Sequence, residues 1–242
     1  SGSRSRRRPH PAAAAFVLSL CAAAVFLVAE ARRLWFFGDD WEFLLLRSVT
    51  ASGDEGIWSP HNEHWSTLPI LAFRALYAAF GVRHYLPYAL LAIAVHLTVV
   101  VLLWWLMLRH GVRPWVATAF GAVLAVLGVG AENTLWDFQI GFMGSVMFGL
   151  LALLLMPTLP QPVRGDGSVL VAIAAALMCS GEGLVMLGVV TLYALLLRGL
   201  RAAVPLGGFG LTLYATWYVA IGHVGTPNDS GSGRAARGVA RG

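Results

Sequence analysis

Long apolar runs alternate with short polar segments along most of the chain. The first run, Pro11 to Ala29, is uncharged, and six more follow at about 85–108, 115–131, 140–156, 168–181, 183–197 and 202–222. Runs of this kind and length are typical of membrane-spanning helices. The pattern therefore predicts an all-α fold, a polytopic transmembrane helix bundle of about seven spans.

The fifth and sixth runs are short for a hydrocarbon core of about 30 Å, so one long helix through Glu182 is the alternative. Gly181 and Gly183 favour a break between two helices. Two spans also keep Arg198 on the same side of the membrane as Arg109. We therefore expect seven spans, with the N-terminus inside and the C-terminus outside.

The polar segments divide the chain into three parts. Residues 1–10 form a basic cytoplasmic N-terminus, and residues 11–222 form the transmembrane module. Residues 223–242, rich in Gly, Ser and Arg, are expected to be a disordered external tail or the point at which a longer protein is cut. A signal peptide that ends at "AEA" is the alternative for the first run, and it places the following residues outside as well.

Within the module, residues 30–84 form a large external loop. Its apolar pieces are broken by acids, Gly and Pro. The segments "WEFLLLR" and "LPILAFRALYAAF" predict one or two short interfacial helices.

Composition supports a membrane protein. Of the 242 residues, 58% are hydrophobic and 12% charged, and the mean hydropathy is +0.72. All 17 basic residues are Arg, and they flank the apolar runs instead of alternating with exposed aromatics. This arrangement follows the positive-inside pattern and excludes a nucleic-acid-binding surface. We expect a multi-pass protein of the plasma membrane.

The acidic residues are distributed unevenly in this topology. Of the 12 acids, Asp166 alone falls on the predicted cytoplasmic side. Asp and Glu contribute little to orientation, so topology does not explain the bias. A site outside the membrane that uses carboxylates would explain it.

The stretch "LWFFGDDWEFLLLR" places two acids, Asp39 and Asp40, between aromatic residues. Paired carboxylates raise one another's pKa, which suits a general base or a metal site. The alternative is a solvated loop in which an Asp caps the following helix. The flanking aromatics would hold the acids at the membrane surface, although aromatics at this depth are also ordinary anchors.

Two other polar segments contain candidate binding groups. "SPHNEHW" gathers His61, Asn62, Glu63 and His64, and its two His could share a ligand on a helix, bind sugar or phosphate, or only make the loop polar. "AENTLWDFQIGF" combines Trp136 with acids and amides, which suits a sugar-binding lip, whereas a polar cap on two helices is the alternative. The candidate sugar ligands of this second external loop are Glu132, Asp137 and Gln139.

Several single residues complete the candidate site. Arg83 and His84 begin the second span from outside, where they could hold a lipid phosphate or anchor the helix at the interface. Glu182 lies at a helix break on the outer side and could reach the same external pocket. His96 lies in mid-span, where a hydrogen bond to a neighbouring helix is the simplest explanation.

Together these features resemble the GT-C superfamily of membrane glycosyltransferases. The nearest members are polyprenyl-phosphate-sugar-dependent enzymes akin to protein O-mannosyltransferases and lipid A aminoarabinose transferases. The resemblance covers about residues 11 to 222 and includes the seven-helix module with a large first external loop. Its residues are the acid pair Asp39 and Asp40, the run with Glu63, His64 and Arg74, and the loop from Glu132 to Gln139.

The resemblance implies an inverting transfer of a sugar from a polyprenyl phosphate to an acceptor glycan, lipid or protein at the outer face. Asp39 would be the general base, and Asp40 would orient the acceptor or a bound divalent metal. Arg83 would stabilise the leaving phosphate. Family members continue with further helices, so we expect either a truncated product or a partner chain that supplies them.

Two other classes of function stay open. A flippase or transporter of lipid-linked sugars should place polar groups at the membrane midplane. In this sequence the carboxylates gather on one face instead. An inactive scaffold or gene fragment would have no use for the acid pair.

Overall fold

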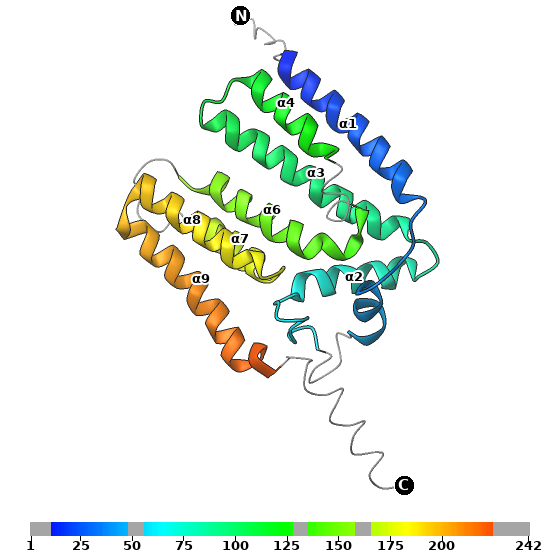
Figure 1. Cartoon of the computed structure of the whole chain (residues 1–242). Helices are drawn as coiled ribbons and strands as arrows, with labels where there is room; N and C mark the ends of the chain where they lie inside the picture. Colours follow the sequence, from blue (N-terminus) through cyan, green and yellow to red (C-terminus); the bar gives the residue numbers. More distant parts are fainter. Residues whose placement is uncertain (1–10, 48–55, 128–134, 158–165, 225–242) are drawn as a thin grey trace, which may run out of the picture.

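The computed structural model describes residues 11–47, 56–127, 135–157 and 166–224. Within these ranges the chain is all-helical, as predicted, and apart from one isolated bridge between His61 and His64 it has no strand pairing. Figure 1 shows the helices of the bundle side by side, with α2 at one end of it. In chain order the elements are α1 (Pro11–Ala31), η1 (Glu42–Leu46), α2 (Thr67–Phe80), α3 (Leu86–Arg109), α4 (Pro114–Ala125), η4 (Asp137–Gln139), α6 (Ile140–Leu155), α7 (Gly167–Leu177), α8 (Glu182–Arg198), α9 (Leu200–Ala220) and η6 (Gly222–Val224).

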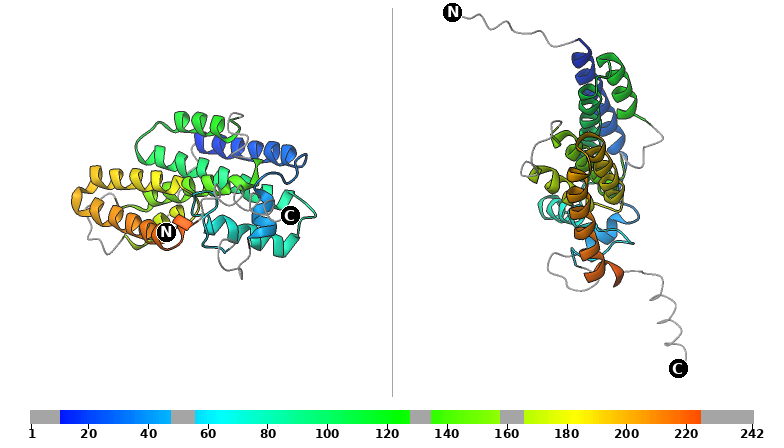
Figure 2. Two further views of the ribbon diagram at one scale, coloured as in Figure 1. Left: turned by 60° about the horizontal axis from the view of Figure 1, so that its bottom comes forward. Right: turned by 90° about the vertical axis from the view of Figure 1, so that its left-hand side faces the viewer.

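The long helices pack in an order that the connections alone do not reveal. Helix α3 contacts both α4 and α6, α1 packs on α3 and α4, and α7, α8 and α9 pack beyond α6. Seen edge-on, the bundle is thin and elongated (Figure 2). Large apolar side chains stay exposed on the outer faces, among them Val25, Val171, Leu196 and Val219. Exposed apolar faces of this extent are typical of surfaces that contact lipid.

Three helices among the described residues are long and apolar enough to cross a membrane: Pro11–Ala31, Leu86–Arg109 and Asp137–Leu155. They are compatible with a membrane protein. Helices α4 and α7 have only 12 and 11 residues. At about 1.5 Å per residue they measure about 18 and 17 Å, short of a hydrocarbon core of about 30 Å. The predicted spans 115–131 and 168–181 are therefore longer than the helices found there, although residues 128–131 lie outside the described ranges.

The predicted break between the fifth and sixth runs is confirmed. Helix α7 ends at Leu177 and α8 begins at Glu182, so one long helix through this point is wrong. The two short helices expected in the first loop are also present. They are η1, a single π-helical turn, and α2.

The two ends of the bundle differ in chemistry. At one end Arg198 donates to the buried carboxylate of Asp166 at 2.8 and 3.0 Å, and Arg109 donates to the carbonyl oxygens of Leu153 and Met156, where α6 ends. We call this the arginine end. The opposite end, which we call the carboxylate end, is where α1 finishes and where α3, α6 and α8 begin (Figure 1). It contains Asp39, Asp40, Glu42, Asp137 and Glu182.

The segment before α2 packs across the carboxylate end. The indole Nε1 of Trp217 in α9 donates to the carbonyl of Trp58 at 2.8 Å, and the ring of Trp217 stacks on Trp65 with centroids 5.0 Å apart. The backbone N–H of Leu68 donates to the carbonyl of Met178, which follows α7. These contacts bring the polar residues of the first loop close to the beginnings of α6 and α8.

Candidate functional site

Asp40 is the anchor of the turn that follows α1. Its Oδ2 accepts from the backbone N–H of Phe37 and its Oδ1 accepts from the indole Nε1 of Trp136, each at 2.9 Å. Gly38 allows this turn, because its φ of 58° is unfavourable for other residues and a Cβ there would lie 3.3 Å from the Trp136 ring. The side chain of Asp40 thus binds the backbone of a residue that precedes it. It does not cap the helix that follows, so the helix-capping Asp considered as an alternative is not found at Asp40.

A second buried carboxyl group faces Asp40 from the start of the third long candidate span. Asp40 and Asp137 are 0% and 1% exposed, and neither carboxyl oxygen of Asp137 has a hydrogen-bond partner among the described residues. Two ionised carboxylates buried close together would repel one another, so we expect the pair to hold one proton. Burial raises the pKa of Asp40 above its usual range, and the negative charge of Asp39 adds to this rise.

Tyr85 completes this buried group. Its hydroxyl donates to the carbonyl of Leu135 at 2.7 Å and accepts from the backbone N–H of Asp137 at 3.2 Å. The phenol therefore fixes the backbone around Asp137. The position of Asp137 differs from an exposed sugar-binding lip, because its carboxyl group is covered on all sides by protein.

Asp39 points away from its neighbour. Its side chain is 43% exposed, and its Oδ2 lies 3.6 Å from Nε2 of His61. Adjacent acids therefore occupy different environments, one accessible and one sealed. Of the two, Asp39 is the carboxylate that a substrate can reach.

A charged network lies behind Asp39. The Oε1 of Glu42 is 2.9 Å from Nδ1 of His61 and accepts from Nη2 and Nε of Arg47 at 2.9 and 3.2 Å. Arg47 also donates to the carbonyl oxygens of Ser59 and Pro60. The close contact with His61, followed by the charges of His61 and Arg47, holds the pKa of Glu42 below its usual range, against the effect of burial.

The two His of "SPHNEHW" lie in a tight turn and not on a helix. The N–H of each one donates to the carbonyl of the other at 3.0 and 2.9 Å. Glu63 at the tip is exposed. His64 packs against the turn between α7 and α8 so closely that a Cβ at Gly181 would lie 2.5 Å from its Nδ1. A cavity of about 10 Å³ beside both His is no larger than one water molecule, so it cannot admit a sugar.

The residues around Asp40 do not suit a divalent metal. Both of its oxygens already accept an N–H, and the side chain is fully buried. Among the described residues no group of three or more His, Cys, Asp or Glu is placed to hold a metal ion. We therefore assign no step to a metal.

Two predicted residues from distant parts of the chain line one groove. Gln139 and Glu182 border a space of about 440 Å³ together with Phe142, Met143 and Val146. Gln139 is 8% exposed, and its Oε1 has no hydrogen-bond partner among the described residues. The Ser180 hydroxyl donates to the Glu182 carboxylate. The Oε1 of Gln139 is covered by protein, so the acceptor oxygens at the groove are those of the Glu182 carboxylate. The groove therefore suits a ligand that carries hydroxyl groups beside an apolar part.

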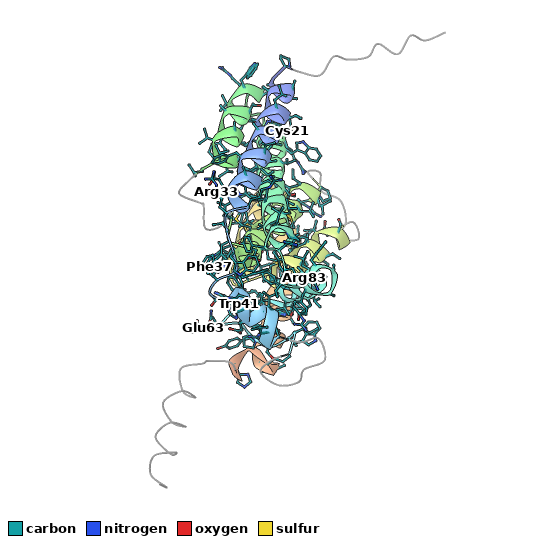
Figure 3. The ribbon with its side chains drawn as sticks, turned by 90° about the vertical axis from the view of Figure 1, so that its right-hand side faces the viewer. Cys21, Arg33, Phe37, Trp41, Glu63 and Arg83 are labelled. Carbon is teal, nitrogen blue, oxygen red and sulfur yellow. The ribbon has the colours of Figure 1, made fainter. Side chains whose placement is uncertain are left out.

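Arg83 and His84 lie in the exposed turn between α2 and α3. Figure 3 shows Arg83 on one side of the carboxylate end and Phe37, Trp41 and Glu63 on the other. The structure therefore does not bring Arg83 beside the acid pair. Glu132 lies outside the described residues.

The chain matches no family model, no curated protein and no solved structure. Its function has to be inferred from its own residues. Some of these were not singled out by the sequence, namely Glu42, Arg47 and the phenol of Tyr85. Glu42 and Arg47 flank a short apolar turn, and that spacing alone does not indicate that Glu42 faces His61 and that Arg47 holds Glu42.

Proposed function

We propose that this chain is the membrane module of an inverting glycosyltransferase. It moves a sugar from a polyprenyl phosphate to an acceptor at the carboxylate end, which faces outwards from the plasma membrane. Asp39 is the general base, and Asp40 positions it. In this proposal seven helices cross the bilayer, including α4 and α7, which are short on their own. The seven are α1, α3, α4, α6, α7, α8 and α9.

The observation that carries the proposal is the different environment of the two adjacent acids. Asp40 is fully buried and holds the turn through Phe37 and Trp136. Asp39 is left accessible, with a charged network behind it. A solvated polar loop has no need for such an arrangement, whereas a base needs one accessible carboxylate on a rigid support.

The reaction balances without a further reagent. Asp39 takes the proton of the acceptor hydroxyl while that oxygen forms a bond to the anomeric carbon. The bond from this carbon to the phosphate oxygen breaks, and the polyprenyl phosphate leaves with the electron pair. Attack from the opposite face inverts the configuration. The phosphate leaves as a stable anion, so no acid has to protonate it.

The groove beside Gln139 and Glu182 supports a lipid-linked sugar as the donor. Its polar edge offers acceptors to sugar hydroxyls, and Phe142, Met143 and Val146 offer an apolar wall. A free phosphate would be repelled by Glu182, so the phosphate group itself has to lie elsewhere.

The transporter alternative is less well supported. The mid-span His96 donates from Nε2 to the carbonyl of Ala125 at 3.3 Å, so it links α3 to α4. This hydrogen bond is the one predicted as the simplest explanation for His96. The carboxylates described above instead lie together at one end of the bundle.

The test measures donor binding and donor consumption separately in the full chain. For binding, undecaprenyl monophosphate, the part common to such donors, is added in steps and the tryptophan fluorescence of the chain is recorded. For consumption, undecaprenyl phosphate carries radiolabelled mannose, glucose or arabinose, and the loss of label from the lipid is measured. We expect Asp39→Asn to bind as the wild type does and to lose about 10²–10⁴-fold in turnover. Asp40→Asn should lose less turnover or lose affinity. Consumption by Asp39→Asn at the wild-type rate would overturn the enzyme proposal.

A further inference from the structure

His61 has a role that neither the fold nor the acid pair explains. The imidazole is 2% exposed and lies between the rings of Phe43 and Phe138, with centroids 5.0 and 5.1 Å away. A buried imidazole in apolar surroundings needs partners for both of its nitrogens. A substrate cannot touch this ring directly, because protein covers it.

Two carboxylates face the two nitrogens. Nδ1 lies 2.9 Å from Glu42, and Nε2 lies 3.6 Å from Asp39 and 3.2 Å from the amide nitrogen of Asn62. The contact with Glu42 lacks the alignment of a hydrogen bond, but a lone pair at Nδ1 would be repelled by the ionised carboxylate 2.9 Å away, so Nδ1 carries the hydrogen. Nε2 then carries no hydrogen, and its lone pair accepts a hydrogen bond from the amide of Asn62 and faces Asp39. Glu42 itself is held in place by Arg47.

We propose that His61 receives the proton that Asp39 removes from the acceptor, and that the chain Asp39–His61–Glu42 thereby regenerates the base. The inference rests on the proposed function. His61 is a positioning residue, since it acts through Asp39 and touches no substrate. In the step, the O–H bond of the protonated Asp39 breaks and an N–H bond forms at Nε2. After the product leaves, this N–H bond breaks and the proton returns to solvent through Asp39, which is 43% exposed.

The charges around the ring favour this transfer. The step restores the negative charge of Asp39 and creates an imidazolium between two carboxylates, Asp39 and Glu42. The charges facing His61 are these two carboxylates and, through Glu42, the guanidinium of Arg47. The gap of 3.6 Å is an ion-pair distance and too long for a hydrogen bond, so the proton moves when Asp39 swings inwards. Such contacts commonly tighten once substrate is bound.

The first test is a pH–rate profile of donor consumption with undecaprenyl-phosphate mannose, glucose or arabinose, whichever is consumed. His61→Asn keeps a donor for Glu42 but has no site for the proton at Nε2. We expect turnover to fall by about 10–100-fold, with the Michaelis constant for the donor unchanged. The shape of the profile should change, because Nε2 no longer takes part in the proton transfer. His110→Asn, which changes an exposed His bonded to Tyr193 at the arginine end, should leave both rate and profile unchanged.

A purely structural role would give a different result. His61→Asn would then lose the same factor at every pH, or lose donor affinity, and either outcome overturns the inference. A wild-type rate and profile in this variant would overturn it as well.

A second measurement needs no activity. Nitrogen NMR of the full chain labelled with [¹⁵N]histidine, purified in detergent, should show His61 with hydrogen on Nδ1 and none on Nε2 at neutral pH. Glu42→Gln should shift population to the other tautomer. A wild-type His61 with hydrogen on Nε2 would overturn the inference, whatever the enzyme assays show. Should Asp39→Asn keep its activity while the expected tautomer is found, the proposed function fails and the His61 relay fails with it, but the Glu42–His61 contact stands.

Discussion

The buried carboxyl pair has a consequence that can be measured as stability. Asp40 lies beside Asp137 without exposure to solvent, and burial raises the pKa of Asp40. The folded chain then binds a proton more tightly than the unfolded chain does. The resulting stabilisation is complete below the unfolded pKa, about 3.9, and is lost as the pH rises through the folded pKa.

Asp137→Asn should remove this pH dependence. The amide of Asn is neutral and can donate to ionised Asp40, so the pair no longer needs a shared proton. We expect the thermal midpoint of the wild type to fall between pH 5 and 8 and that of the variant to fall much less. At pH 8 the variant should be more stable by about 1–3 kcal/mol. Thermal unfolding in detergent measures both.

Asp39→Asn is the matched control for this prediction. It removes the same charge from an accessible neighbour, so the wild-type decline with pH should persist. Parallel curves for the wild type and Asp137→Asn would show that Asp40 and Asp137 share no proton.

The sequence could indicate that the acid pair matters but not how its members differ. Asp39 and Asp40 have the same side chain and neighbouring positions. Asp40 differs in environment because it bonds Trp136, which lies almost a hundred residues away in the chain. The same limit applies to His61, whose carboxylate partners become visible only when the first loop folds back on itself. By contrast, Gln139 and Glu182 were predicted to share a pocket, and they do line one groove.

Among the helices, the turn between α7 and α8 depends most on close approach. Gly183, in the first turn of α8, lies against the end of α7, and a Cβ there would overlap the carbonyl oxygen of Ala176 and lie 2.7 Å from Cα of Leu177. Both obstacles are backbone atoms, which cannot turn aside as a side chain can. The same turn packs against His64, and its Met178 carbonyl accepts a hydrogen bond from the backbone N–H of Leu68.

Gly183→Ala should therefore destabilise the chain and loosen the first loop. Overpacking of this kind typically costs about 1–3 kcal/mol. Gly188→Ala in the same helix is the control, since a Cβ there meets nothing within 4 Å. It should be neutral or stabilise by up to about 1 kcal/mol. The thermal midpoints of the two variants in detergent decide the matter, and equal midpoints would contradict the close packing seen at Gly183.

Apolar runs predicted where the helices lie more accurately than how long they are. The break at Gly181 was visible because Gly and an acid interrupt an otherwise apolar stretch. The short length of α4 was not visible, because apolar residues continue past the point at which the helix ends, whereas the run that forms α7 was already expected to be short. Hydrophobicity indicates whether a segment lies in an apolar environment. The residue at which a helix ends is determined by packing and backbone hydrogen bonds.

The arginine end shows that charge can serve packing and topology at once. Arg198 neutralises buried Asp166, and Arg109 satisfies carbonyl oxygens at the end of α6 that have no partner within the helix. These two Arg were counted as evidence for a cytoplasmic face. Each also has a structural reason to be where it is, so the orientation needs a test that does not depend on charge.

Cysteine labelling supplies that test and also separates seven spans from three. With both native cysteines replaced, single cysteines are placed at exposed positions, Glu63 and His223 at the carboxylate end and Ser168 and Leu200 at the arginine end. Seven spans put the first two outside and the other two inside. An impermeant maleimide should then label Glu63→Cys and His223→Cys in intact cells, and Ser168→Cys and Leu200→Cys only after the membrane is opened. Labelling of Ser168→Cys in intact cells would mean that α6 does not end in the cytoplasm, and the proposed orientation would fall with it.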